Sequence, residues 1–297
     1  MRPQKIIIDC DPGIDDALAI VLAHGSPDLE ILGITTVGGN VGLAGTTDNA
    51  LRLREFLGFT GVPITPGSAG ALLRTRVDAA RVHGPSGLGA ALLPPATLPV
   101  SGGHAVDFIV ETLRAAPGEV TLVAIGPLTN VALAVLKEPR IVDWAKGLTI
   151  LGGSYTRGNF SRRRVQHRRR PGGRRDRLRR RWTVTMIGLD VSRGAMTTEA
   201  VADRMRTMGR LGTDLLIPCV EYYGVITADS GPAIHDACAI AYLIDPSLIT
   251  VEPAVVDVET AGRFTSGMTV TDFRPVDRTP NALVGTSLDA AASGTSS

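Results

Sequence analysis

Four carboxylates fall within eight residues near the start of this 297-residue chain: Asp9, Asp11, Asp15 and Asp16. A Pro-Gly turn separates the two pairs. Capping a helix requires one aspartate and explains only one of the four. Because like charges packed together are unfavourable unless a cation neutralises them, the cluster predicts a metal site. Ca²⁺ takes about six to eight oxygen ligands, so it suits such a cluster.

A second candidate pair, His235-Asp236, lies far along the chain. An aspartate at the start of a helix is usually only a favourable charge at the helix dipole. If the pair lies beside the first cluster, it has a possible function, since Asp236 could complete the ligand shell of a cation. Because a histidine side chain can change its protonation near neutral pH, His235 could donate a proton.

Small turns hold the remaining candidates, in Gly38-Gly39-Asn40, Ile125-Gly126-Pro127 and Gly158-Asn159. Asparagine at a turn often serves only backbone conformation. Asn40 and Asn159 could equally hydrogen-bond hydroxyl groups. His83 lies in a long loop rich in Gly and Pro, and taken alone it is more typical of a surface residue than of a ligand.

The elements predicted to position these residues alternate between strands and helices. Strands are predicted at residues 5–9, 29–37, 62–64, 120–125, 148–151 and 183–189. Helices are predicted at residues 14–24, 44–57, 104–115, 128–136, 197–208, 211–223 and 235–243. This order indicates an α/β fold with one open, mostly parallel sheet flanked by helices, as a single domain over 1–297. Ligands bind such sheets beyond the carboxyl ends of the strands, where the candidates lie.

The formal net charge of +2 conceals a strong asymmetry. Residues 162–181 contain twelve arginines and one acid, Asp176. Outside this segment 19 basic and 28 acidic residues remain, a net charge of −9. Basic patches that bind single-stranded nucleic acid usually combine arginine with aromatic residues, and only Trp182 lies nearby. A nucleic-acid-binding protein nevertheless remains an alternative interpretation.

Cysteine content and hydropathy narrow the class of protein further. Cys10, Cys219 and Cys238 lack the spacing of a disulfide framework or a zinc site. The N-terminus has no signal-peptide pattern, and no apolar run approaches the roughly 18 residues of a membrane span. We expect a cytoplasmic protein without membrane or nucleic-acid partners.

Together the motifs resemble the nucleoside hydrolase family of the inosine–uridine-preferring type. The family's opening signature, D-[TC]-D-P-G-[IL]-D-D-A, matches residues 9–17 without departure. Further family motifs match at residues 37–40, 82–87, 126–130, 158–159, 184–190, 235–239 and 265–274. The resemblance covers about residues 5–160 and 182–290. It fails in 161–181 and at the extreme C-terminus.

The resemblance implies the Rossmann-like nucleoside hydrolase fold and a Ca²⁺ site. The ion would be held by Asp11, Asp16, Asp236 and the main-chain carbonyl of Ile125. Asp11 would also act as the general base on the attacking water. Asp16 and Asp236 would contribute to binding the ribose.

The resemblance also implies the substrate contacts. Asp15 would bind the ribose hydroxyls, and Asn40 and Asn159 would contact the water or the ribose. His83 and His235 would face the base, with His235 as the proton donor to it. The implied reaction is hydrolysis of the N-glycosidic bond of ribonucleosides in nucleoside salvage, through a transition state with oxocarbenium character. We expect a homodimer or homotetramer.

One rival enzyme class is a phosphatase of the haloacid dehalogenase type, with Asp9 as nucleophile and Asp11 as acid and base. The D-x-D spacing after an N-terminal strand permits this interpretation. It leaves the Asp15-Asp16 pair and the His235-Asp236 pair without a role.

The arginine run has a further explanation, a shifted reading frame. Where residues 161–178 stand, the family carries S-P-x-A-E-F-N and then D-P-E-A-A. Codons allowed for 161–173, read one base later, encode P-A-A-E-F-N-I-V-A-D-P-E. Residues 293–297 behave in the same way. We therefore expect 162–181 to be an aberrant, disordered segment and the chain to be impaired in activity.

Overall fold

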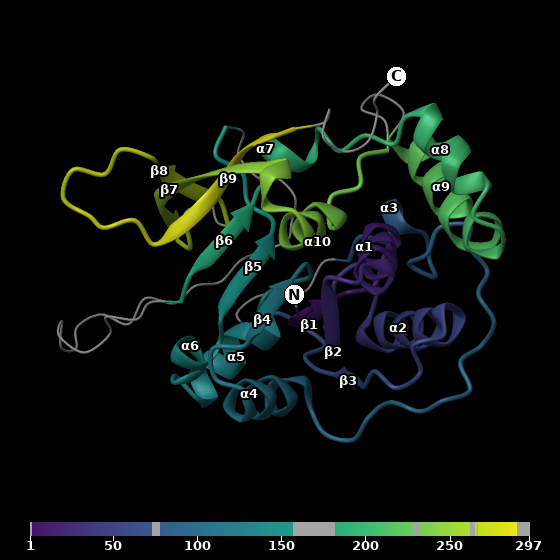
Figure 1. Ribbon diagram of the computed structural model, residues 1–297, viewed down its shortest axis with the longest axis horizontal. Helices are drawn as coiled ribbons and strands as arrows, with labels where there is room; N and C mark the ends of the chain where they lie inside the picture. Colours follow the sequence, from purple (N-terminus) through teal and green to yellow (C-terminus); the bar gives the residue numbers. More distant parts are fainter. Residues whose placement is uncertain are drawn as a thin grey trace.

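The computed structural model describes residues 2–72, 78–156, 182–227, 232–261, 265 and 267–289. Within this part of the chain, nine strands form one sheet in the order β3-β2-β1-β4-β5-β6-β9-β7-β8 (Figure 1). The strands are β1 (Gln4–Cys10), β2 (Leu29–Thr36), β3 (Ile64–Pro66), β4 (Val120–Ala124), β5 (Gly147–Leu151), β6 (Val184–Ile187), β7 (Ile249–Val258), β8 (Thr269–Asp272) and β9 (Ala282–Leu288). Neighbours from β3 to β9 pair in parallel, while β7 and β8 add antiparallel pairs.

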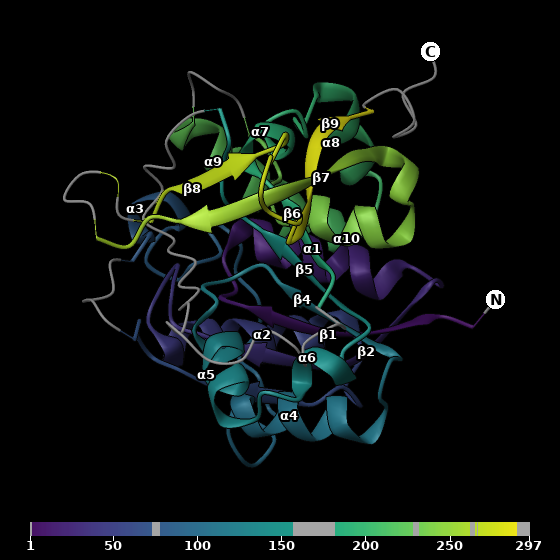
Figure 2. The same cartoon turned by 90° about the vertical axis from the view of Figure 1, so that its left-hand side faces the viewer.

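Helices cover both faces of the sheet (Figures 1 and 2). They are α1 (Ile14–Gly25), α2 (Leu43–Leu57), α3 (Ala80–His83), α4 (Ala105–Ala115), α5 (Thr129–Lys137), α6 (Ile141–Trp144), α7 (Leu189–Ser192), α8 (Glu199–Arg206), the π-helix η1 (Leu211–Leu216), α9 (Ile217–Ile226), α10 (Ala237–Ile244) and the short η2 (Pro246–Leu248). Helices α1, α2, α9 and α10 contribute to one hydrophobic cluster, and α4, α5 and α6 to the other.

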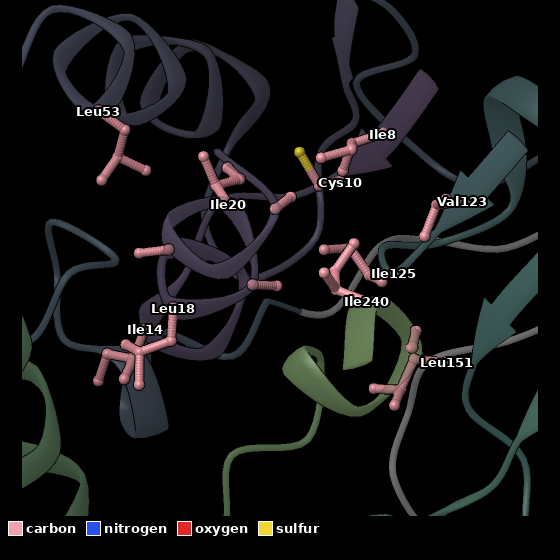
Figure 3. Packing of buried hydrophobic residues seen from close by; sticks show 14 of the residues in the cluster. Ile8, Cys10, Ile14, Leu18, Ile20, Leu53, Val123, Ile125, Leu151 and Ile240 are labelled. Carbon is pink, nitrogen blue, oxygen red and sulfur yellow. The ribbon is translucent and has the colours of Figure 1, made fainter. Parts of the chain in front are cut away.

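The alternation of β1 shows how the sequence builds two cores. Ile6, Ile8 and Cys10 belong to the cluster beneath α1, whereas Ile7 belongs to the cluster beneath α4 and α5. A parallel strand buried on both faces needs this continuous apolar run. Figure 3 shows Cys10 among the apolar side chains of the first cluster, with Ile125 beside Ile240 of α10. Helix α10 packs against α1 and β5, and Ile240 lies beside the residue that follows β4.

The predicted α/β fold with a mostly parallel sheet is confirmed. Two boundaries differ where chemistry is expected: the strand predicted at 183–189 ends at Ile187, and Leu189 starts α7. The helix predicted from 235 begins at Ala237, which leaves His235 and Asp236 in the preceding turn.

No strand is expected from the sequence after residue 243, yet β7, β8 and β9 follow there. Exposed polar residues interrupt their apolar pattern, as at Glu252 of β7. Strand β9 also inserts between β6 and β7. The segment 162–181, with Asn159 just before it, and residues 293–297 lie outside the described residues. Every helix that the structure describes is too short or too polar to span a membrane.

Candidate active site

Asp9 is separate in function from the other three carboxylates of its motif. Its Oδ1 accepts hydrogen bonds from Thr35 Oγ1 at 2.6 Å and from Asn130 Nδ2 at 2.8 Å. Burial raises the pKa of Asp9 to about 6, against the effect of these two hydrogen bonds. A fully buried carboxylate tied to neighbouring elements is unsuited to attack an external phosphate. Asp9 is therefore a structural residue in this arrangement.

Asn130 is a residue that the motifs contain but to which they assign no role. Its amide nitrogen also donates to the Thr36 carbonyl at 3.0 Å, and its Oδ1 accepts from the Ser68 amide at 2.9 Å. One buried side chain thus joins β1, the end of β2 and the turn after β3. The signal in the sequence is an asparagine in the first turn of a helix directly after a strand.

Asp11 and Asp16 are held together through Asn40. The Asn40 backbone amide donates to Asp11 Oδ2 at 2.7 Å, and its side-chain amide donates to Asp16 Oδ2 at 2.8 Å. Asp16 also accepts from the backbone amides of Asp11 and Gly13, at 3.1 and 3.0 Å. Both carboxylates and Asn40 are completely buried. The turn after β2 therefore orients the acidic turn after β1.

Glycines provide the space that these side chains occupy. A Cβ on Gly39 would lie 1.9 Å from Asp11 Oδ2, and one on Gly126 would lie 2.8 Å from Asp11 Oδ1. A Cβ on Gly13 would lie 2.3 Å from Asn40 Nδ2. The glycines of three turns are thus required by close approach of polar side chains rather than by backbone conformation.

Three buried carboxylates converge from two distant parts of the chain. One oxygen from each of Asp15, Asp16 and Asp236 lies within 4.8 Å of the others, so the group could hold a metal ion. Asp15 and Asp16 occupy the first turn of α1, and Asp236 immediately precedes α10. The packing of Ile240 beside Ile125 fixes α10 one turn beyond Asp236 (Figure 3). Asp11 adjoins this group through its hydrogen bond to Asp16.

His83 is buried, contrary to the surface position that its loop suggests. Its Nδ1 accepts from the Ile14 amide at 3.2 Å and lies 3.9 Å from Asp15 Oδ1. Its ring stacks on Tyr223 with centroids 6.2 Å apart. Asn49 of α2 holds the loop by donating to two backbone carbonyls, at Pro12 and Ser86. The sequence gives Asn49 no motif, so its role is seen only in the structure.

His235 lies half-buried in the turn before α10, next to Asp236 in the chain. Its Nδ1 is 2.9 Å from the hydroxyl of Ser192, the last residue of α7. The candidates from the turns after β1 and β2, the 82–87 loop and the turn before α10 are thus arranged around the carboxyl ends of the central strands. Asn159 lies outside the described residues.

Comparison with known proteins identifies the family to which the chain belongs. Residues 6–293 match the family model described as "Inosine-uridine preferring nucleoside hydrolase". The chain belongs to this family.

Individual relatives are similar to this nucleoside hydrolase in sequence or in structure over most of their length. The "Inosine-uridine preferring nucleoside hydrolase" of Leishmania major is 41% identical over 278 residues, covering 92% of this chain and 88% of that protein. The "Non-specific ribonucleoside hydrolase RihC" of Shigella flexneri is 40% identical over 269 residues, covering 90% and 88%. The solved structure of a plant nucleoside hydrolase superposes with a TM-score of 0.85 at 26% identity, covering 98% of this chain and 96% of that one.

By descent this nucleoside hydrolase is therefore a ribonucleoside-hydrolysing enzyme. The comparisons favour neither the phosphatase nor the nucleic-acid-binding interpretation. The buried, hydrogen-bonded position of Asp9 argues against the phosphatase independently.

Proposed function

We propose that this nucleoside hydrolase cleaves inosine and uridine to free base and ribose with the aid of Ca²⁺. The observation that carries the proposal is the convergence of two of the proposed ligands, Asp16 and Asp236, with the ribose-binding candidate Asp15: one oxygen of each of these buried carboxylates lies within 4.8 Å of the others. A buried cluster of this charge requires a cation to be stable in its ionised form. The substrates are those named for the relatives in Leishmania major and in the family description.

The donor chemistry fits Ca²⁺ better than a softer metal. The proposed ligands are carboxylate oxygens of Asp11, Asp16 and Asp236 and the carbonyl oxygen of Ile125, and hard cations prefer such an all-oxygen set. The thiol of Cys10, the residue before Asp11, is fully buried, and its pKa is raised well above the ordinary value by desolvation. It is therefore unsuited to act as a thiolate ligand.

Separate residues are proposed for the separate steps of the hydrolysis. Asp11 is the proposed general base that takes a proton from the attacking water, with its carboxylate oriented by Asn40. Asp15 is the proposed partner of the ribose hydroxyls. Its negative charge stabilises the positive charge that develops on the sugar in the transition state. His235 is the proposed proton donor to the departing base. A bound Ca²⁺ supplies positive charge that lowers the pKa of a neighbouring water.

Further contacts complete the proposal. His83 faces the base, Asn40 and Asn159 contact water or ribose, and Asp16 and Asp236 add to ribose binding. The enzyme acts in nucleoside salvage in the cytoplasm as a homodimer or homotetramer. These assignments follow the residue types and the family motifs that this chain shares.

Activity of this chain is proposed to be impaired by the arginine run at 162–181. The family motif in that region contains a glutamate and an asparagine that hold ribose hydroxyls, and this sequence has neither. The alignment with the Leishmania major relative extends over 92% of the chain and 88% of the relative, which supports an altered segment rather than an added one.

The test is release of base from inosine and uridine by a high concentration of the purified chain, with Asp11→Ala as the comparison. Base should appear without inorganic phosphate and at a rate above that of Asp11→Ala. Asp245→Asn, on the surface at η2, should match the unaltered chain. Release that depends on inorganic phosphate, or that is equal in Asp11→Ala, contradicts the proposal.

A further inference from the structure

Ser192 is a completely buried serine whose hydroxyl contacts the proposed proton donor. Its Oγ lies 2.9 Å from His235 Nδ1. Among the described residues, no other hydrogen bond of this hydroxyl is found. A hydroxyl can both donate to and accept from an imidazole nitrogen, so it holds the ring in its neutral and its protonated form. A carboxylate or carbonyl at this place could only accept.

The backbone fastens the segments of these two residues to each other. The Ser192 amide donates to Gly188 O, and its carbonyl accepts from the Ala195 amide, both at 3.1 Å. The Ile234 amide then donates to Ala195 O at 2.9 Å, beside the antiparallel bridge of Met196 with Ala233. The separation between hydroxyl and ring is therefore set by paired backbone, not by loose side chains.

A second anchor holds α7 from its other side. Asp190 accepts hydrogen bonds from Ser154 Oγ at 2.9 Å, from the Tyr155 amide at 2.7 Å and from Thr156. The one-turn helix is thus tied both to the segment after β5 and to the turn before α10. Because α7 is held on both sides, Ser192 is suited to fix the orientation of the His235 ring instead of moving with the ring.

We propose that Ser192 is a positioning residue for proton donation: it engages Nδ1 of His235 and so directs Nε2 toward the departing base. The inference rests on the proposed function, because it gives His235 the role of proton donor. The alternative is a purely structural contact, in which His235 only provides a hydrogen-bond partner for the buried hydroxyl of Ser192. In that case removing the hydroxyl would leave the state of the ring unchanged.

The first experiment measures the ring nitrogens of His235 by ¹⁵N NMR in the full chain, which needs no catalytic activity. In Ser192→Ala the two nitrogen shifts should move toward each other, as expected for a ring that exchanges between tautomers. Ser192→Thr, which keeps a hydroxyl, should retain the original shifts. Ser154→Ala loosens the other anchor of α7 and should also retain them. Unchanged His235 shifts in a folded Ser192→Ala protein overturn the proposal.

The second experiment compares two ribosides on the full chain and on the chain with its frame restored over 162–178. Ser192→Ala should lower kcat for inosine by about tenfold with little change in KM, as expected from weakened acid catalysis. Hydrolysis of 4-nitrophenyl riboside, whose leaving group departs without a proton, should be unaffected. Equal losses on both substrates contradict a positioning role. Absence of base release from every substrate by the unaltered and frame-restored chains would instead contradict the proposed function, and the NMR result would still decide the role of Ser192.

Discussion

The side-chain amide of Asn40 lies 2.8 Å from Asp16 Oδ2 and 2.9 Å from the carbonyl oxygen of Asp11. One buried asparagine after β2 therefore fixes both the backbone and a carboxylate of the acidic turn after β1. The carboxylate of Asp16 is then aimed by a neighbouring strand end rather than by its own helix alone.

Asn40→Ala should lower the free energy of unfolding by about 1–3 kcal/mol, because buried acceptors lose their donor. It should also weaken Ca²⁺ binding, since Asp16 loses its side-chain donor and is held only by the backbone amides of Asp11 and Gly13. Chemical denaturation and calorimetric titration measure the two effects. Asn281→Ala is the matched control: the Asn281 side chain also makes two hydrogen bonds, but both are with the backbone of Val256 in β7 and neither reaches the acidic cluster. An equal Ca²⁺ affinity in both variants would count against the arrangement.

Calcium titration should show one bound ion in the unaltered chain and at least tenfold weaker binding in Asp16→Ala and Asp236→Asn. The reason is that each change removes one charge from a buried group of acceptors. Ca²⁺ at 100 times its Kd should stabilise the fold by about 2.7 kcal/mol by linkage. Asp245→Asn should behave like the unaltered chain. The metal site is refuted by the same affinity in Asp16→Ala as in the unaltered chain.

Gly39→Ala should destabilise the fold by about 1–3 kcal/mol and displace the Asp11 carboxylate, because the new methyl group would lie 1.9 Å from Oδ2. Base release should fall together with stability. Gly25→Ala is the matched control, since no atom lies within 4 Å of its added Cβ. Thermal unfolding and base release measure both variants, and equal behaviour of the two would show that the space at Gly39 is not needed.

Asp190 gives a pH dependence of stability. Partial desolvation opposes ionisation, but hydrogen bonds from Thr156, Tyr155 and Ser154 outweigh it and lower the pKa of Asp190 below its ordinary 3.8. The folded state therefore favours the carboxylate, so this stabilisation is present above pH 3.8 and is lost as the pH falls through the lowered pKa.

Asp190→Asn should cost stability at pH 7, and the difference from the unaltered chain should shrink as the pH falls below 3.8. Urea denaturation at a series of pH values measures this difference. A difference that is constant with pH would mean that the charge of Asp190 contributes nothing.

Restoring the frame over 162–178 should raise the rate of base release by orders of magnitude, because the family's ribose-binding glutamate and asparagine return. Steady-state kinetics of the two chains compares them directly, and resequencing the gene tests the origin of the run. A gene confirmed as it stands, with hydrolysis by the present chain at the rate of the frame-restored chain, would exclude the frameshift.

Much of this site could be predicted because its residues follow strands that the apolar pattern marks clearly. Asp11 comes directly after β1 and Asn40 lies in the turn that follows β2, and parallel strands bring their carboxyl ends to one edge. The position of Asp236 was harder to predict, because only the structure shows that α10 packs against α1 and β5. The supporting roles of Asn130, Asn49 and Ser192 depend on pairings between distant segments, which spacing along the chain does not encode.

The C-terminal strands illustrate the same limit. Strand β9 pairs in parallel with β6 and antiparallel with β7, although β7 and β8 precede it in the chain. Its position is therefore defined by its pairing with strands that are distant in the chain. No local pattern in residues 282–288 could reveal those neighbours.

Formation of the acidic cluster depends on folding of almost the whole chain. Asp16 and Asp236 are 220 positions apart, so an ion held by both would close most of the chain into a single loop. Closing a loop of this length is entropically costly until the intervening strands have paired. Tight cation binding would therefore report that the polypeptide on both sides of the arginine run has reached its native topology. A titration with Ca²⁺ would serve as an assay of complete folding, even in a chain that turns over no substrate.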